Sequence, residues 1–206
     1  MSAAHPLFLK GLAFGLVLAA TVGPMWVLCL RRTLAFGAGV GAASGMGIAV
    51  ADGFYGAVAA FGLTAVSGFL LAWSFWIGLA GAVFLVYLGA KALLSHPASE
   101  ADVARPSGFA QAFFSTFGLT LANPPTILAF AAIFAALGLA ANADYRDAAL
   151  VTLGVFLGSA AWWLFLAAAA GRLRARLGPR VLRGINVVSG ITILGFAAWQ
   201  IARLLR

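Results

Sequence analysis

Long uncharged, apolar runs are the feature that most constrains how this chain can fold. The runs cover residues 11–30, 33–51, 53–90, 106–143, 148–171 and 184–202. A membrane-spanning helix needs about 20 apolar residues, so the third and fourth runs each exceed one span. With 64% hydrophobic and only 9% charged residues, the chain has too little polar surface to cover a water-soluble globule. We therefore predict an all-α membrane protein.

Six membrane-spanning helices account for these runs if the second helix continues from the second run into the start of the third. The first run is long enough for a full span and contains Gly23-Pro24, so we interpret it as a retained helix and not as a secretory signal. We expect the helices near residues 8–31, 37–62, 67–92, 109–138, 147–171 and 183–204.

The chain divides into two similar halves of a single transporter domain. A polar linker, SHPASEADVARPS at residues 95–107, separates repeat one, about residues 1–95, from repeat two, about residues 108–206. The segment LAATVGPMW in the first repeat aligns with LTLANPPTI in the second at an offset of about 100 residues. Because each repeat has three helices, the second must insert with opposite topology. This predicts the two inverted repeats that are common among secondary transporters.

A proline interrupts the first expected helix of each repeat, at Gly23-Pro24 and at Asn123-Pro124. Proline removes a backbone hydrogen bond, and within a bilayer the freed polar groups are tolerated where they line a cavity. The two breaks therefore predict a site near the membrane midplane. Their helix ends would suit the carboxylate and the ammonium of a zwitterion. The alternative is a pair of kinks that only shape packing.

Asp52 is the acid that falls inside an expected helix, whereas the other four acids fall in connections. A charged acid at the bilayer centre costs about 2.5 to 3.5 kcal/mol on insertion scales. Asp52 is therefore a candidate proton carrier or ligand for a substrate ammonium. The alternative is a structural carboxylic acid hydrogen-bonded to a neighbouring helix, with Tyr55 one helical turn away as a possible partner.

Other motifs exclude several functional classes. The chain has one cysteine, Cys29, and no His, Cys or carboxylate cluster with ligand spacing, so we expect no metal site. It has no nucleophile beside a base and no nucleotide-binding loop, so we expect neither an enzyme nor a cofactor. Asn186 is a weaker site candidate near a helix end, and Trp199 is expected to be an interfacial anchor.

The basic residues predict the orientation of the chain. They cluster between helices and do not alternate with aromatic residues, which argues against a nucleic-acid partner. Positive charge favours the cytoplasm, so the larger group predicts that both termini lie outside it. The loops after the first, third and fifth helices carry nine of the 13 lysines and arginines: Arg31, Arg32, Lys91, Arg105, Arg172, Arg174, Arg176, Arg180 and Arg183.

Glycines recur every four residues in the second expected helix, at Gly37, Gly41 and Gly45. Small residues at this spacing allow helices to approach closely. Packing within the bundle explains most of this stripe. The same property makes a homodimer possible.

Residues 15–63, which begin GLVLAATVGPMW, resemble the opening of the lysine exporter (LysE-type and RhtB-type) amino-acid efflux proteins. LANPPTILAF at residues 121–130 resembles their Asn-Pro segment, and GAVFLVYLG at residues 81–89 resembles their third helix. Length, helix number and linker position fit across the chain. One difference is that many relatives have Pro-Gly-Pro in the first helix, where this chain has Val22-Gly23-Pro24.

The resemblance implies a multi-pass protein of the bacterial inner membrane that exports amino acids using the proton gradient. By motif, it carries over a central site of Gly23, Pro24, Asp52, Tyr55, Asn123 and Pro124. Two alternatives stay open. A metal or other cation efflux protein would need more ligands than one membrane acid supplies. A non-transporting membrane scaffold would depend on its glycines and not on the acid.

Overall fold

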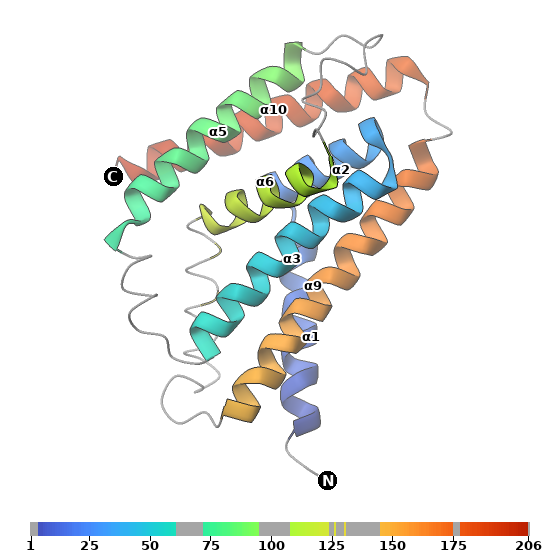
Figure 1. Cartoon of the computed structure of the whole chain (residues 1–206). Helices are drawn as coiled ribbons and strands as arrows, with labels where there is room; N and C mark the ends of the chain where they lie inside the picture. The colour runs from blue at the N-terminus through green and yellow to red at the C-terminus, as the bar shows by residue number, and fades with distance from the viewer. Residues whose placement is uncertain are drawn as a thin grey trace.

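The computed structural model describes residues 4–60, 72–94, 108–123, 126, 130, 145–174 and 178–205 of the 206-residue chain. These residues form helices and turns and contain no strand, which confirms the all-α class. With the labels of Figure 1, the helices are α1 (Ala4–Ala20), α2 (Pro24–Phe36), α3 (Ala38–Ala60), α5 (Ser74–Leu94), α6 (Phe109–Leu121), α9 (Tyr145–Arg174) and α10 (Pro179–Leu204).

Some of these helices are long and apolar enough to cross a membrane. Among the described residues, Tyr145–Arg174 and Arg183–Leu204 qualify singly, and the bent pair formed by α1 and α2 adds a third if it counts as one span. Gly78–Ala90 and Phe109–Leu121 are shorter apolar helices. The membrane class is therefore supported, while the six-span arrangement in two inverted repeats remains a prediction.

The first expected helix, residues 8–31, is in fact two helices that meet at an angle of 73°. Gly23 is the extended N-cap of α2, and Pro24 is its first helical residue. Proline suits that position because the first N–H groups of a helix have no intrahelical partner. At the other end, Gly37 has φ +94° and donates its N–H to the Thr33 carbonyl oxygen. This backbone conformation favours glycine, so α2 ends and α3 begins one residue later.

The placement of Arg31 and Arg32 in a loop is wrong. Both lie inside α2 and are buried, at 3% and 6% exposure. Arg31 donates from Nε to Asn186 Oδ1 of α10 at 3.2 Å, which gives Asn186 a structural contact. Arg32 donates from Nη1 to Ser44 Oγ at 3.2 Å and to the Ala112 carbonyl oxygen at 3.1 Å, so it joins α2 to α3 and α6. The two arginines connect helices instead of facing the aqueous phase.

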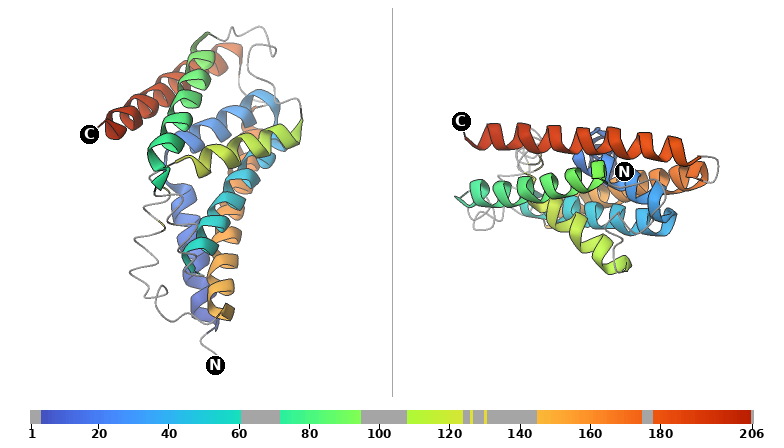
Figure 2. Two further views of the ribbon diagram at one scale, coloured as in Figure 1. Left: turned by 60° about the vertical axis from the view of Figure 1, so that its left-hand side comes forward. Right: turned by 90° about the horizontal axis from the view of Figure 1, so that it is seen from above.

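The helices pack in two groups with α2 and α6 between them (Figures 1 and 2). In one group, α9 runs along α1 and α3, and in the other α5 lies beside α10. Helix α6 packs on α3, and α2 contacts α3, α9 and α10. Helices from both halves of the sequence are therefore neighbours in space, which brings the two expected proline breaks within reach of each other.

Glycines allow α1 and α9 to touch at backbone distance. A Cβ at Gly11 or Gly15 would collide with the α9 backbone at Val151 or Val155. A Cβ at Gly158 would in turn collide with the backbone carbonyl of Leu12. Because any larger side chain would force the helices apart, these positions require glycine for the observed packing.

The glycine stripe of α3 is also occupied within the chain. Gly41 faces Thr33 of α2, and Gly45 faces Trp163 of α9. Gly47, beside the stripe, faces Phe113 of α6. The stripe therefore serves packing within the chain, and it offers no argument for a homodimer.

Candidate functional site

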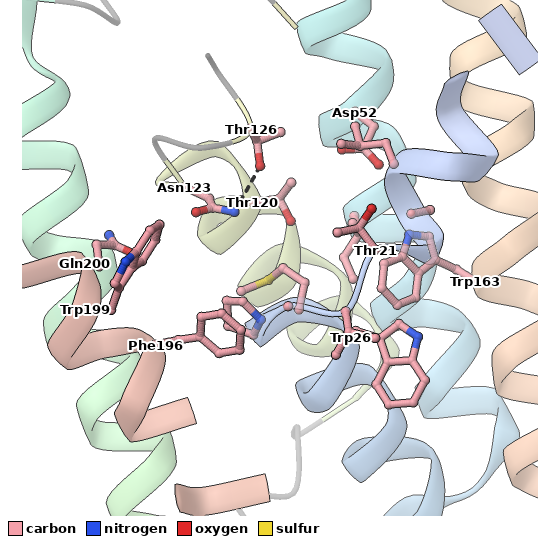
Figure 3. A pocket seen from close by; sticks show the side chains of 17 residues that line it. Thr21, Trp26, Asp52, Thr120, Asn123, Thr126, Trp163, Phe196, Trp199 and Gln200 are labelled. Atoms are coloured by element: carbon pink, nitrogen blue, oxygen red, sulfur yellow. Dashed lines mark hydrogen bonds between the residues drawn. The ribbon is translucent and has the colours of Figure 1, made fainter. Parts of the chain in front are cut away.

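A cavity of about 320 Å³ lies where the two breaks meet (Figure 3). Four of the expected site residues line it: Gly23, Pro24, Asp52 and Asn123. Tyr55 is not among its lining residues, and Pro124 lies outside the described residues. The described residues that line it are Leu18, Ala19, Thr21, Val22, Gly23, Pro24, Met25, Trp26, Ile48, Asp52, Thr120, Asn123, Thr126, Trp163, Phe196, Trp199 and Gln200.

The start of α2 leaves backbone donors without a partner inside the helix. Gly23 has no side chain to cap the helix, Pro24 has no N–H, and the first intrahelical bond runs from the Val27 N–H to the Gly23 carbonyl oxygen at 3.1 Å. The backbone N–H groups of Met25 and Trp26 therefore have no acceptor within the helix. Both residues line the cavity, and the helix dipole places partial positive charge at this end.

The second break is a turn held by Asn123 after α6. The Asn123 N–H donates to the Thr120 carbonyl oxygen at 3.1 Å, and its carbonyl oxygen accepts from the Thr126 N–H at 3.0 Å. Its side-chain Nδ2 donates to Thr126 Oγ1 at 3.0 Å. Asn123 thus closes the turn with both its backbone and its side chain, and α6 ends at Leu121, next to the break predicted at Asn123-Pro124.

Asp52 lines the cavity and is hydrogen-bonded to α9. Its side chain is buried, with the residue 3% exposed, and Oδ2 accepts a hydrogen bond of 2.7 Å from Ser159 Oγ. Tyr55 has a different role, because its hydroxyl donates to the Leu121 carbonyl oxygen at 2.6 Å and its ring packs on Phe130. The alternative of a structural acid predicted a hydrogen bond to a neighbouring helix, with Tyr55 as a possible partner; the bond exists, and its donor is Ser159 of α9. No sequence signal marks Ser159, which lies in a long uncharged run.

Helix α10 supplies a wall that the sequence did not indicate. Phe196, Trp199 and Gln200 line the cavity, and Gln200 Nε2 donates to the Gly78 carbonyl oxygen of α5 at 2.7 Å. Trp199, expected to be an interfacial anchor, has its ring under the Arg203 guanidinium at 4.7 Å. Helix α10 is therefore part of the site, together with the start of α2, the turn after α6, α3 and α9.

The chemistry of the lining is mostly apolar and aromatic around one acid. Among the described residues that line the cavity, Asp52 is the one with an ionisable acid or base in its side chain. In the part of the chain that the structure describes, no group of three or more His, Cys, Asp or Glu side chains could hold a metal ion. Nothing in this site favours the alternative of metal efflux.

Comparison with known proteins gives a family and a relative. The family model described as LysE type translocator matches residues 16–202. The chain is also similar to a protein of Bacillus subtilis (strain 168) named "Putative amino acid efflux protein YcgF", with 28% identity over 197 residues, which covers 92% of each chain. No solved structure matches.

Proposed function

Since the chain belongs to the LysE type translocator family, we propose that it exports an amino acid or a similar small metabolite across the bacterial inner membrane in exchange for protons. The observation that carries this proposal is the cavity where the first break, the turn after α6 and Asp52 meet. The similarity to a protein named for amino acid efflux supports the substrate class.

The cavity has complementary groups for the two charges of an amino acid. Asp52 can bind the ammonium group as a carboxylate. The backbone donors of Met25 and Trp26, at the positive end of the α2 dipole, can bind the carboxylate. Both sets of groups line the same cavity, so one zwitterion can engage them together.

Asp52 is also placed to carry the proton. Ser159 occupies Oδ2, and Oδ1 has no hydrogen bond to another described residue. The Ser159 hydroxyl can serve both forms of the acid, since it can donate to a carboxylate and accept from a carboxylic acid. Asp52 would release its proton when it binds the substrate ammonium and regain a proton on the return step.

We further propose that the two repeats are related by a two-fold axis in the membrane plane and rock against each other during transport. The helix contacts support this arrangement. If the halves are equivalent, α1 corresponds to α6, α3 to α9, and α5 to α10. The α1–α9 contact then corresponds to the α6–α3 contact, and both are observed. The α3–α9 and α5–α10 contacts each correspond to themselves. A two-fold relation between the halves requires this equivalence.

Replacing Asp52 with asparagine tests the proton role. The amide would keep the shape of the acid and could still bond to Ser159, but it could not titrate, so net export driven by a pH gradient should fall to background. Exchange of substrate without a pH gradient should need a higher substrate concentration, because the amide lacks the charge that binds the ammonium, but it should continue at saturating substrate. The assay compares the two modes in proteoliposomes at matched protein levels, with Asp147→Asn, in the first turn of α9, as the control. Undiminished pH-driven export by Asp52→Asn would remove this residue from the mechanism.

A further inference from the structure

We propose that the transported amino acid is neutral and has an apolar side chain. This inference rests on the export function proposed above and narrows its substrate class. It follows from the charges, the hydrogen bonds and the aromatic side chains of the cavity that Figure 3 shows.

The charge of the lining excludes a second charge on the substrate. Asp52 is the charged side chain of the described lining, and the ammonium group common to all amino acids would use it. Lysine or arginine would need a further acid for its side chain. Glutamate or aspartate would need a cation, and the buried Arg31 and Arg32 are not lining residues. Burying an unpaired charge is costly, so the geometry favours a neutral side chain.

The neutral polar residues of the wall already use donors within the protein. The hydroxyl groups of Thr21 and Thr120 donate to the carbonyl oxygens of Val17 and Thr116, one turn earlier in the chain. The Gln200 amide donates to α5, and the Asn123 amide donates to Thr126. These side chains therefore hold the scaffold together and have reduced capacity to bind a polar substrate group.

Four aromatic side chains are among the remaining lining residues. Trp26 of α2, Trp163 of α9, and Phe196 and Trp199 of α10 all line the cavity. In Figure 3, Trp26 and Trp163 lie on the side of α2 and α9, while Phe196 and Trp199 lie on the opposite side. An apolar side chain between these rings would be removed from water on both its faces, which is the main source of apolar binding energy.

The free backbone N–H groups at the start of α2 indicate where the carboxylate binds. Met25 and Trp26 contribute them, and both residues line the cavity. The positive end of the α2 dipole lies at the same place. The carboxylate would therefore lie near Met25 and Trp26, the ammonium near Asp52, and the side chain toward α10.

The size of the cavity suits a single amino acid. Small-molecule sites usually measure about 300 to 1,000 Å³, and this cavity, at about 320 Å³, is at the lower end of that range. A single amino acid with a branched or aromatic side chain is the substrate that best matches this volume and lining.

The test is competition for exchange in proteoliposomes that contain the purified full chain. Leucine and phenylalanine should compete with half-saturating concentrations about tenfold or more below those of threonine, lysine and glutamate, which is the discrimination that apolar pockets usually achieve. Preference for threonine, lysine or glutamate would overturn the inference while leaving amino-acid export intact. If none of the five amino acids competes or exchanges, the proposed export function fails with it.

Variants test the aromatic wall directly. Phe196→Ala should raise the half-saturating concentration of leucine about tenfold and change that of threonine little. Phe165→Ala is the matched control, because Phe165 is 63% exposed on α9 and does not line the cavity. Trp199→Ala repeats the test if Phe196→Ala does not reach the membrane. If the wall variant and Phe165→Ala had the same half-saturating concentration of leucine, the aromatic wall would not bind the substrate side chain, and this assignment would be overturned.

Discussion

Replacing Gly158 with alanine tests the close contact between α1 and α9 that positions two sides of the cavity. A Cβ at Gly158 would lie well inside 3.0 Å of the Leu12 carbonyl oxygen, a distance that real Cβ atoms essentially never show. Ordinary contact begins near 3.4 Å. Because the obstacle is backbone and not a flexible side chain, the two helices must separate.

The expected loss of stability follows from two opposing effects. Overpacking a close contact costs about 1 to 3 kcal/mol, whereas alanine gains about 0.5 to 1 kcal/mol over glycine within a helix. With the middle of each range, the net loss should be about 1 kcal/mol. Gly195→Ala in α10 is the control, because a Cβ there meets no atom within 4 Å. It should show only the helix gain, so the two variants should change the free energy of unfolding in opposite directions.

The same substitution should also impair transport. Ser159 follows Gly158 directly and donates to Asp52 at 2.7 Å, and such a bond weakens as the atoms separate beyond about 3.2 Å. The assays are thermal unfolding in detergent, followed by tryptophan fluorescence, and leucine exchange in proteoliposomes. If Gly158→Ala were as stable and as active as Gly195→Ala, the helices would not be held at backbone distance and the reasoning would be refuted.

Two further changes test other parts of the site. Tyr55→Phe removes the hydroxyl that donates to the Leu121 carbonyl oxygen and should lower the unfolding free energy by about 0.5 to 1.5 kcal/mol, measured by the same thermal unfolding; a stability equal to that of the parent would show that the bond contributes nothing. For orientation, a cysteine introduced at Ser99 in a Cys29→Ser background should resist a membrane-impermeant thiol reagent in intact cells, since the basic loops predict a cytoplasmic linker; rapid labelling from outside would mean that the termini lie in the cytoplasm.

The sequence alone was sufficient to predict the class of protein and to identify three parts of the candidate site. The long apolar runs predicted a helical membrane protein, because a helix satisfies its own backbone groups inside a bilayer and about 20 apolar residues form one span. Gly23-Pro24 predicted the break between α1 and α2, and Asn123 marked the turn after α6. Asp52 stood out because an acid in a spanning segment is costly enough to need a function or a partner.

Only the tertiary structure decided which side chains meet Asp52 and which face the cavity. In a soluble helix, the apolar stripe indicates the buried face, but a membrane helix is apolar toward lipid and toward its neighbours alike. Nothing in the pattern therefore distinguishes Ser159, which contacts Asp52, from a residue that faces lipid, or shows that Phe196 and Gln200 line the cavity. For the same reason, Arg31 and Arg32 could be mistaken for loop residues, since their burial depends on acceptors in α3, α6 and α10 that lie far away in the sequence.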